Sequence, residues 1–211
     1  MEAVVFDLDG VVVDTEKYWN QVEEDIYSET VDSGDVDTQE LAGMSITNTY
    51  QYLSENYDVS ISLDEFFEMY EERAEKVYME KAALMPNLKN LISDIRKRDL
   101  KIGLATGSYW PEYVIERFNL EFDAVVDSGQ VEGDGKPEPE TYRMAVERLG
   151  VEPEKAIAID DTDAGISSAK GAGLYCIGYE ESDGQTLSEA DETVESPKEL
   201  AQRLKALTEA P

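Results

Sequence analysis

The sequence predicts an α/β fold, in which a mostly parallel sheet carries helices on both faces and a helical unit is inserted near the N-terminus. From residue 86 onward, short apolar runs alternate with helical stretches, which is the rhythm of parallel strands joined by crossover helices. A further apolar run stands alone at residues 3–6. Between these two regions, residues 15–83 are rich in Glu, Tyr and Asn and poor in strand signals.

Short apolar, β-branched runs predict the strands. Residues 3–6 (AVVF) have the pattern of a buried strand, which ends at the sequence DLDG and delivers two carboxylates at its carboxyl end. Four more strands are predicted at residues 101–105, 124–126, 155–159 and 174–177. Helices are predicted at residues 86–98, 111–118, 138–149, 163–171 and 197–207. Pro86 is expected to start the first of these helices, because proline is favoured in a first turn.

The inserted segment is predicted to be mostly helical. Apolar residues recur in it at the spacing of an amphipathic helix, at Leu63, Phe66, Phe67, Tyr70, Ala74 and Val77. The predicted domains are therefore a core formed by residues 1–14 and 84–211, and a helical cap formed by residues 15–83.

The charge of the chain is extreme, because 48 acidic and 18 basic residues give a formal net charge of −30. Such a field repels nucleic acid and anionic membranes, so we expect neither as a partner. The acidic residues are spread along the whole chain, and the composition resembles that of haloarchaeal proteins. That resemblance implies adaptation to a high-salt cytoplasm and loss of structure in low salt. A non-catalytic acidic binding or storage protein is the alternative interpretation.

Several features predict a cytoplasmic protein. A strand is expected within two residues of Met1, which leaves no room for a signal peptide. No apolar run approaches the roughly 18 residues of a membrane span. The single cysteine, Cys176, is expected to be a small buried residue of a strand, since it has no second cysteine with which to form an internal disulfide. We expect a monomer or a weak homodimer.

The residues available for catalysis are limited by the absence of histidine, which excludes Ser-His-Asp and Cys-His catalysis and every His-ligated metal site. Ligands of open parallel sheets bind beyond the carboxyl ends of the strands. Polar candidates follow four such ends: Asp7 and Asp9, then Thr106, then Lys136, then Asp160 and Asp161. Each alone could be a turn residue, a helix cap or a solvated surface group. Together they indicate an active site at one edge of the sheet.

These same residues carry a resemblance to the haloacid dehalogenase (HAD) superfamily. DLDGVVVDTE at residues 7–16 resembles its first motif, and Thr106 matches its hydroxyl motif. GKPEP at residues 135–139 resembles its lysine motif, and DDTDAGI at residues 160–166 its acidic motif. All four occur in the family's order and spacing and cover essentially the whole chain. The resemblance, to the phosphoglycolate phosphatase and β-phosphoglucomutase-like branch, implies a Rossmann-like core with a helical cap.

The resemblance also implies a role for each carboxylate. Asp7 would be the nucleophile that attacks phosphorus to form an aspartyl-phosphate, and Asp9 would act as general acid and then as general base. A Mg²⁺ ion would offset the repulsion between carboxylates and phosphate. By resemblance it would be bound by Asp7, the backbone carbonyl of Asp9 and Asp161, with Asp160 assisting directly or through water.

The remaining motif residues would contact the phosphoryl group. Lys136 would supply positive charge to the nucleophile and the phosphoryl oxygens. Thr106 would offer its hydroxyl and its backbone N–H to a phosphoryl oxygen, and Gly107 and Ser108 would add N–H donors.

The predicted function is that of a phosphoric monoester hydrolase acting on a small phosphate ester, with sugar phosphates and phosphoglycolate as plausible substrate classes. The presence of Asp9 argues against a dehalogenase, which needs no acid/base residue at that position. A phosphonate hydrolase should present a Schiff-base lysine, but no convincing motif flanks the cap lysines. A sugar phosphomutase of the β-phosphoglucomutase type stays open, although its cap usually supplies a histidine, and an arginine after a Gly-x-Ser element. Here GMS at residues 43–45 is followed by Ile46.

The polar residues of the cap have two possible roles, ligand binding or a purely structural one. Five of them could face a ligand or could instead belong to a solvated face or to helix packing: Asn48, Tyr50, Tyr52, Arg73 and Lys76. The sequence does not distinguish these alternatives.

Overall fold

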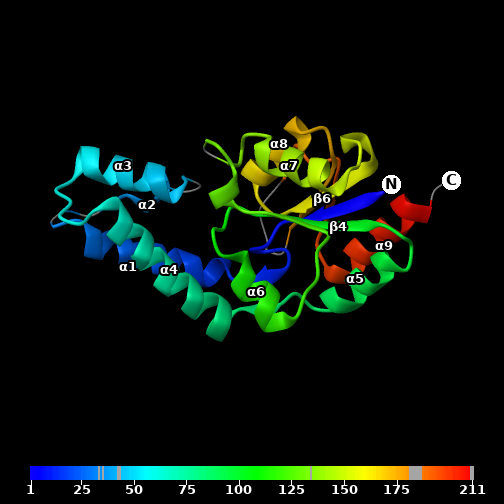
Figure 1. The fold of residues 1–211 in the computed structure, drawn as a ribbon, viewed down its shortest axis with the longest axis horizontal. Helices are drawn as coiled ribbons and strands as arrows, with labels where there is room; N and C mark the ends of the chain where they lie inside the picture. The colour runs from blue at the N-terminus through cyan, green and yellow to red at the C-terminus, as the bar shows by residue number, and fades with distance from the viewer. Residues whose placement is uncertain (33, 35, 42–43, 134, 181–186, 210–211) are drawn as a thin grey trace. The chain divides into compact units, whose positions relative to one another are not determined.

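The computed structural model describes residues 1–32, 34, 36–41, 44–133, 135–180 and 187–209 (Figure 1). The chain divides into two compact units. The core unit comprises Met1–Asp14 and Ala83–Pro211, and the helical unit comprises Thr15–Ala82. Each unit is described by itself.

The core unit is built on a six-stranded sheet with the order β5-β4-β1-β6-β7-β8, in which every neighbouring pair is parallel. The strands are β1 (Ala3–Phe6), β4 (Lys101–Ala105), β5 (Ala124–Val126), β6 (Ala156–Asp160), β7 (Tyr175–Tyr179) and β8 (Glu192–Val194). β1 and β6 are buried along their whole length, as expected of central strands covered on both faces. The predicted α/β class and parallel sheet are confirmed.

Helices cover both faces of this sheet. α7 (Glu140–Leu149) and α8 (Asp163–Gly171) lie on one face, and α5 (Leu88–Arg96) and α9 (Pro197–Glu209) on the other (Figure 1). α6 (Pro111–Phe118) and the short 3₁₀ helices η2 (Ser128–Gln130) and η3 (Pro153–Lys155) complete the unit. The core cluster joins α7 and α8 to the sheet and includes the buried Cys176, as predicted.

The predicted strands and helices of the core unit agree with the structure to within two residues, but three short strands were not predicted: β2 (Val13–Asp14), β3 (Ala83–Leu84) and β8. Pro86 does not start α5: the helix begins at Leu88, because Asn87 adopts a left-handed φ of 64° that interrupts a helical path. β8 is a three-residue edge strand of sequence ETV, which carries no apolar run to reveal it.

The helical unit contains α1 (Glu16–Thr30), α2 (Thr38–Leu41), α3 (Ile46–Asn56), α4 (Leu63–Lys76) and the π-helix η1 (Val77–Lys81). α4 begins with a capping box, in which Ser62 and Glu65 each accept a hydrogen bond from the other's backbone. Among the apolar residues at helical spacing in α4, Phe66, Tyr70 and Ala74 are buried, as the apolar face of an amphipathic helix requires.

Two short strands of the core unit flank the insertion. β2 (Val13–Asp14) pairs antiparallel with β3 (Ala83–Leu84), and the N–H of Met85 donates to the carbonyl of Val12 at 3.0 Å. The chain therefore leaves and re-enters the core unit through one hydrogen-bonded pair of strands. None of the helices in the described ranges is long and apolar enough to cross a membrane.

Candidate active site

Asp7 stands immediately after β1, at the carboxyl edge of the sheet. Its N–H donates to the carbonyl of Ile159 at 2.9 Å. This bond extends the pairing of β1 with β6 by one residue and fixes the backbone position of Asp7. The side chain is buried, whereas Asp9, two residues further on, is half-buried. The turn that follows needs Gly10, which has φ +78° and where a Cβ would overlap the carboxylate of Asp161.

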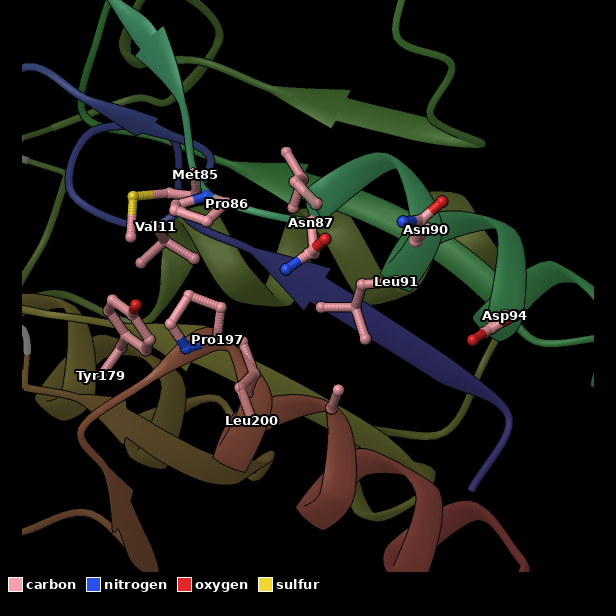
Figure 2. Close-up of a pocket in the computed structure, with 12 residues that line it drawn as sticks. Val11, Met85, Pro86, Asn87, Asn90, Leu91, Asp94, Tyr179, Pro197 and Leu200 are labelled. Carbon is pink, nitrogen blue, oxygen red and sulfur yellow. The ribbon is translucent and has the colours of Figure 1, made fainter.

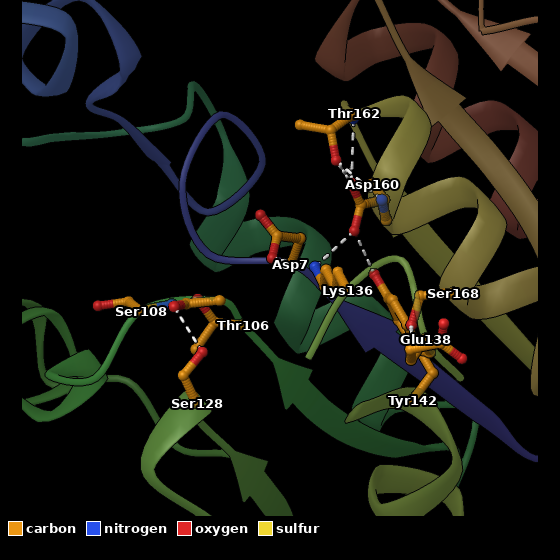
Figure 3. Close-up of polar contacts among 12 residues, drawn as sticks. Asp7, Thr106, Ser108, Ser128, Lys136, Glu138, Tyr142, Asp160, Thr162 and Ser168 are labelled. Atoms are coloured by element: carbon orange, nitrogen blue, oxygen red, sulfur yellow. Dashed lines mark hydrogen bonds and ion pairs between the residues drawn. The ribbon is translucent and has the colours of Figure 1, made fainter. Parts of the chain in front are cut away.

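Lys136 joins two of these carboxylates. Its Nζ lies 2.6 Å from Oδ1 of Asp7 and 2.7 Å from Oδ2 of Asp160, and Figure 3 shows it between them. Burial alone would lower the pKa of Lys136, but the carboxylates of Asp160 and Asp7 raise it above its ordinary value. The ammonium therefore stays charged and places a permanent cation beside the proposed nucleophile.

Asp160 is held by four donors. Its Oδ1 accepts from the N–H and the hydroxyl of Thr162, at 3.0 and 2.8 Å. Its Oδ2 accepts from Lys136 and, at 2.6 Å, from the hydroxyl of Tyr142 on α7. Four donors fill the acceptor sites of one carboxylate. Tyr142 was not among the predicted site residues, although a tyrosine on the buried face of a helix is a signal in itself, because a buried phenol needs a partner.

Three carboxylates converge at this edge. One oxygen each from Asp7, Asp160 and Asp161 lies within 4.8 Å of the others, and all three residues are buried. Burial raises the pKa of Asp7 to about 7, with Asp160 and Asp9 adding to the rise while Lys136 opposes it. Buried carboxylates at this spacing fit a divalent metal ion with oxygen ligands, which would supply the missing positive charge.

The loop after β4 brings Thr106 to the same edge, because β4 is the neighbour of β1. Its contacts show that two N–H groups predicted to face the phosphoryl group, those of Thr106 and Ser108, have partners within the protein. The N–H of Thr106 donates to the carbonyl of Val126 at 3.0 Å, and the N–H of Ser108 donates to the hydroxyl of Thr106 at 2.9 Å. Ser128 holds the loop by donating to the carbonyl of Gly107 at 2.6 Å (Figure 3). The Thr106 N–H is committed to the sheet, so its hydroxyl is the group that can face a ligand.

A separate pocket of the core unit lies beside the connecting strands. It is lined mainly by apolar side chains from the loop after β1, from α5 and from the start of α9 (Figure 2). Val11 and Met85, which flank β2 and β3, both reach it, as does Tyr179. The predicted catalytic residues are not among the described residues that line it, so this pocket is distinct from the carboxylate cluster.

Two of the five candidate ligand residues of the helical unit make contacts inside that unit. The hydroxyl of Tyr50 donates to the carbonyl of Ile61 at 2.8 Å, and Arg73 pairs with Glu29 at 2.6 Å. Asn48 and Tyr52 are half-buried and Lys76 is exposed. Tyr50 and Arg73 therefore each have a partner within the helical unit.

The GMS sequence weighed for the mutase alternative is described only in part. Ser45 caps α3, where its hydroxyl accepts from the N–H of Asn48 at 3.3 Å. Gly43, the first residue of that sequence, lies outside the described residues. Ser45 therefore has a local structural role at the start of a helix.

Known proteins resemble this chain over nearly its full length. Residues 1–173 match the haloacid dehalogenase-like hydrolase family. The phosphorylated carbohydrates phosphatase of Thermotoga maritima is 32% identical, covering 97% of this chain and 99% of its own. The β-phosphoglucomutase of Bacillus subtilis is 30% identical, with coverage of 97% and 93%. The crystal structure of β-phosphoglucomutase from Clostridium difficile superposes with a TM-score of 0.81 at 27% identity, covering 99% of this chain and 97% of that one.

The fold, the four motifs at the strand ends and these similarities agree: the chain belongs to the haloacid dehalogenase-like hydrolase family. It is therefore an enzyme of the hydrolase class, and relatives such as the Thermotoga maritima protein are named phosphatases.

Proposed function

We propose that this chain is a magnesium-dependent phosphatase that removes the phosphate group from a small phosphorylated carbohydrate or a related metabolite. The observation that carries the proposal is the buried cluster at the strand ends, where Lys136 bridges Asp7 and Asp160 beside Asp161. The similarity to a phosphorylated carbohydrates phosphatase supports the substrate class.

In the first step, a carboxylate oxygen of Asp7 attacks phosphorus. A bond forms between that oxygen and phosphorus, the bond from phosphorus to the ester oxygen breaks, and the leaving oxygen takes a proton from the carboxyl of Asp9. Asp9 follows Asp7 by two residues, and its charge adds to the raised pKa of Asp7, which indicates that the two carboxylates lie near each other. The products are the free alcohol and an aspartyl-phosphate on Asp7.

In the second step, water attacks the phosphorus of the aspartyl-phosphate. Asp9, now a carboxylate, accepts a proton from the water, and the bond from phosphorus to Asp7 breaks. Inorganic phosphate leaves and both aspartates return to their starting state. Splitting the hydrolysis into two steps replaces one difficult displacement with two easier ones.

Asp7, the backbone carbonyl of Asp9 and Asp161 are the proposed ligands of Mg²⁺. When bound, the ion offsets the repulsion between the carboxylates and the phosphate and polarises a phosphoryl oxygen. Asp160 had been expected to assist in binding the metal. Its two oxygens already accept four hydrogen bonds, so we assign it to holding Lys136.

Lys136 and Thr106 stabilise charge on the phosphoryl group. The Lys136 ammonium neutralises developing negative charge, and the Thr106 hydroxyl donates to a phosphoryl oxygen. The Gly107 N–H is proposed as a further donor to a phosphoryl oxygen. The Ser108 N–H, predicted as another such donor, instead donates to the Thr106 hydroxyl at 2.9 Å. Preorganised donors of this kind need no rearrangement during the reaction, which is the source of their effect.

The helical unit is proposed to act as a cap that limits the substrate to small molecules. Both of its connections to the core unit run through the β2–β3 pair, and β2 follows Asp9 by only a few residues in the sequence. A unit attached in this way can close over a bound substrate and exclude water. We therefore expect phosphopeptides to be turned over far more slowly than sugar phosphates.

A sugar phosphomutase is the second candidate, favoured by the similarity to β-phosphoglucomutase. The two activities differ in where the phosphate ends: a phosphatase releases it, whereas a mutase returns it to the sugar. The sequence has no histidine to serve in a mutase cap, which favours the phosphatase.

The test is an assay of inorganic phosphate released from a panel of phosphorylated metabolites, together with a chromogenic phosphate ester. We expect release with MgCl2, loss of release with EDTA and recovery on adding Mg²⁺ but not Zn²⁺ alone. Conversion of a sugar 1-phosphate into its 6-phosphate without release would establish the mutase instead. Absence of both reactions from the whole panel would refute a phosphotransfer function.

The net charge of −30 supports the further expectation that nucleic acid and membranes are not partners. We propose that the protein works in the cytoplasm as a monomer or a weak homodimer. Light scattering at high salt across a range of protein concentrations tests the oligomeric state.

A further inference from the structure

Tyr142 is the one aromatic side chain that meets the charged centre of the site through two different contacts described by the structure. Its hydroxyl donates to Oδ2 of Asp160 at 2.6 Å, the same oxygen that accepts from Lys136 at 2.7 Å. The Nζ of Lys136 also lies 5.0 Å from the centre of the Tyr142 ring. One side chain therefore contacts both the lysine and the carboxylate that holds it (Figure 3).

Packing alone does not account for the hydroxyl. Tyr142 is 0% exposed and belongs to the apolar cluster that joins α7 and α8 to the sheet. Phenylalanine would fill the same space without burying a polar group, and burying a hydroxyl is costly unless it is hydrogen-bonded. The hydroxyl instead reaches the carboxylate that determines where Lys136 sits, so its position is tied to the site.

Lys136 has a geometric requirement that this arrangement meets. An ammonium has three N–H donors. Within the described part of the chain, two of them are directed at Asp7 and Asp160, which leaves one for a phosphoryl oxygen. That third direction is fixed only if Asp160 cannot rotate. Thr162 holds one oxygen of Asp160, and Tyr142 holds the other together with Lys136.

We propose that Tyr142 is a positioning residue for phosphoryl transfer, whose hydroxyl fixes Asp160 and whose ring supports Lys136, so that the ammonium stays aimed at the transferred phosphate. The inference rests on the proposed function for its catalytic consequence. The ring adds a cation–π contact to a lysine that is shielded from water, where such contacts are strongest. Burial, followed by the nearby carboxylates of Asp160 and Asp7, raises the pKa of the Tyr142 phenol well above its ordinary value, so it remains a donor.

The test compares two tyrosine-to-phenylalanine variants in the same unit. Tyr142→Phe removes the hydroxyl and keeps the ring. Tyr175→Phe is the matched control, because its hydroxyl also donates to a carboxylate, Glu192, at 2.6 Å, but from the opposite end of the sheet. We expect kcat for the chromogenic ester to fall about tenfold in Tyr142→Phe, since a hydrogen bond to a charged group is worth about that factor. The control should retain wild-type kcat.

A double-mutant cycle separates positioning from general damage. If Tyr142 acts through Asp160, Tyr142→Phe should lower kcat less than about twofold in an Asp160→Asn background, because the two changes remove one shared interaction. Multiplicative losses in the double variant would overturn the proposal. So would a Tyr142→Phe enzyme with wild-type kcat, or one that loses activity no more than Tyr175→Phe.

Binding of inorganic phosphate gives a readout that does not require turnover. In calorimetric titrations with MgCl2 present, we expect Tyr142→Phe to bind phosphate several-fold more weakly than wild type and Tyr175→Phe to bind it equally well. A wild-type protein without turnover but with this difference in binding would refute the proposed function and support the positioning role. Equal binding by wild type and Tyr142→Phe, together with equal kcat, would refute the positioning role alone.

Discussion

The core unit and the helical unit use their polar side chains in different ways. In the core unit, Asp7, Lys136 and Asp160 come from separate loops and strand ends of the sequence and meet at the end of β1. In the helical unit, polar groups are paired between the unit's own helices: Tyr27 with Tyr70, and Arg73 with Glu29. One unit concentrates charge where it must be stabilised, and the other uses polar contacts to hold its helices together.

This difference separates two kinds of buried polar group. At Asp7, several charges converge with few neutralising partners. Such an arrangement lowers the stability of the folded protein and is typical of sites that perform chemistry. A hydrogen bond between two tyrosines at 3.2 Å satisfies both groups and needs no ligand. We therefore expect substitutions in the core cluster to change activity and those in the helical unit to change stability.

The largest expected effect is that of Asp7→Asn, the sharpest test of the core side of this comparison. An amide is a far poorer nucleophile than a carboxylate, so kcat should fall by at least about 10³-fold while the fold persists. Circular dichroism and phosphate release measure the two outcomes. Asp94→Asn, which removes an exposed carboxylate of α5, is the control and should remain fully active. Substantial activity in Asp7→Asn would remove this residue from the nucleophile role.

Asp9→Asn should slow both steps and allow the phospho-enzyme to accumulate. The amide can neither protonate the leaving oxygen nor activate water, and a proton transfer of this kind contributes about 10²- to 10⁴-fold. Mass spectrometry after a rapid acid quench should find phosphate attached to Asp7. Repeated failure to detect it under several quench conditions would argue against a covalent route.

The two adjacent aspartates after β6 should differ in metal dependence. Asp161→Asn should raise the Mg²⁺ concentration for half-maximal activity by about tenfold or more, because it removes a proposed ligand. Asp160→Asn should lower kcat with little change in that concentration, because it disturbs the partner of Lys136. Magnesium titrations of the two variants give the comparison directly. An identical shift in both would return Asp160 to the metal site.

Sequence patterns could predict the core site because its residues stand at fixed points of a regular fold. Asp7 and Asp160 lie at the ends of apolar strands, and parallel strands bring their carboxyl ends to one edge. Tyr142 was missed because it is spaced like an ordinary core residue of α7, and only the structure shows its hydroxyl on Asp160.

The contacts of the helical unit were less predictable, because its polar residues do not stand at fixed points of a regular sheet. Tyr50 and Arg73 were candidates by residue type alone, and their partners are set by how the helices pack. The apolar spacing predicted a helix as far as Val77, but it did not reveal the π-helix that continues from Val77 to Lys81. Such local changes depend on tertiary contacts that apolar spacing does not encode.

Glu23 provides a test of buried charge in the helical unit. Burial raises its pKa to about 7 from an ordinary value of 4.5. The folded state therefore binds more protons than the unfolded state between these two values, and the free energy of unfolding falls as pH rises through this window. Glu23→Gln should reduce that fall by about 3 kcal/mol. Denaturation of both proteins between pH 4.5 and pH 8 at constant high salt measures the free energy of unfolding at each pH. Glu24→Gln, on the same helix but exposed, should keep the wild-type profile.

The smallest expected effects are those of the cap candidates themselves. Tyr50→Phe removes one hydrogen bond, to Ile61, and should cost about 1 kcal/mol of unfolding free energy. Arg73→Ala breaks an ion pair whose Glu29 partner is 54% exposed, so its contribution should be below about 1 kcal/mol. If these residues serve packing, the ranking of substrates across the metabolite panel should stay unchanged in both variants.

The opposite outcome would break the comparison between the two units. A change in substrate ranking in Arg73→Ala, without a matching change for the small chromogenic ester, would mean that Arg73 leaves Glu29 to bind a substrate group. Glu29→Gln is the matched control, because it releases the arginine without removing it. If Glu29→Gln preserves the ranking and Arg73→Ala alters it, the guanidinium contacts substrate. If both preserve it and both lower the unfolding free energy slightly, the helical unit uses this pair only to hold its own helices.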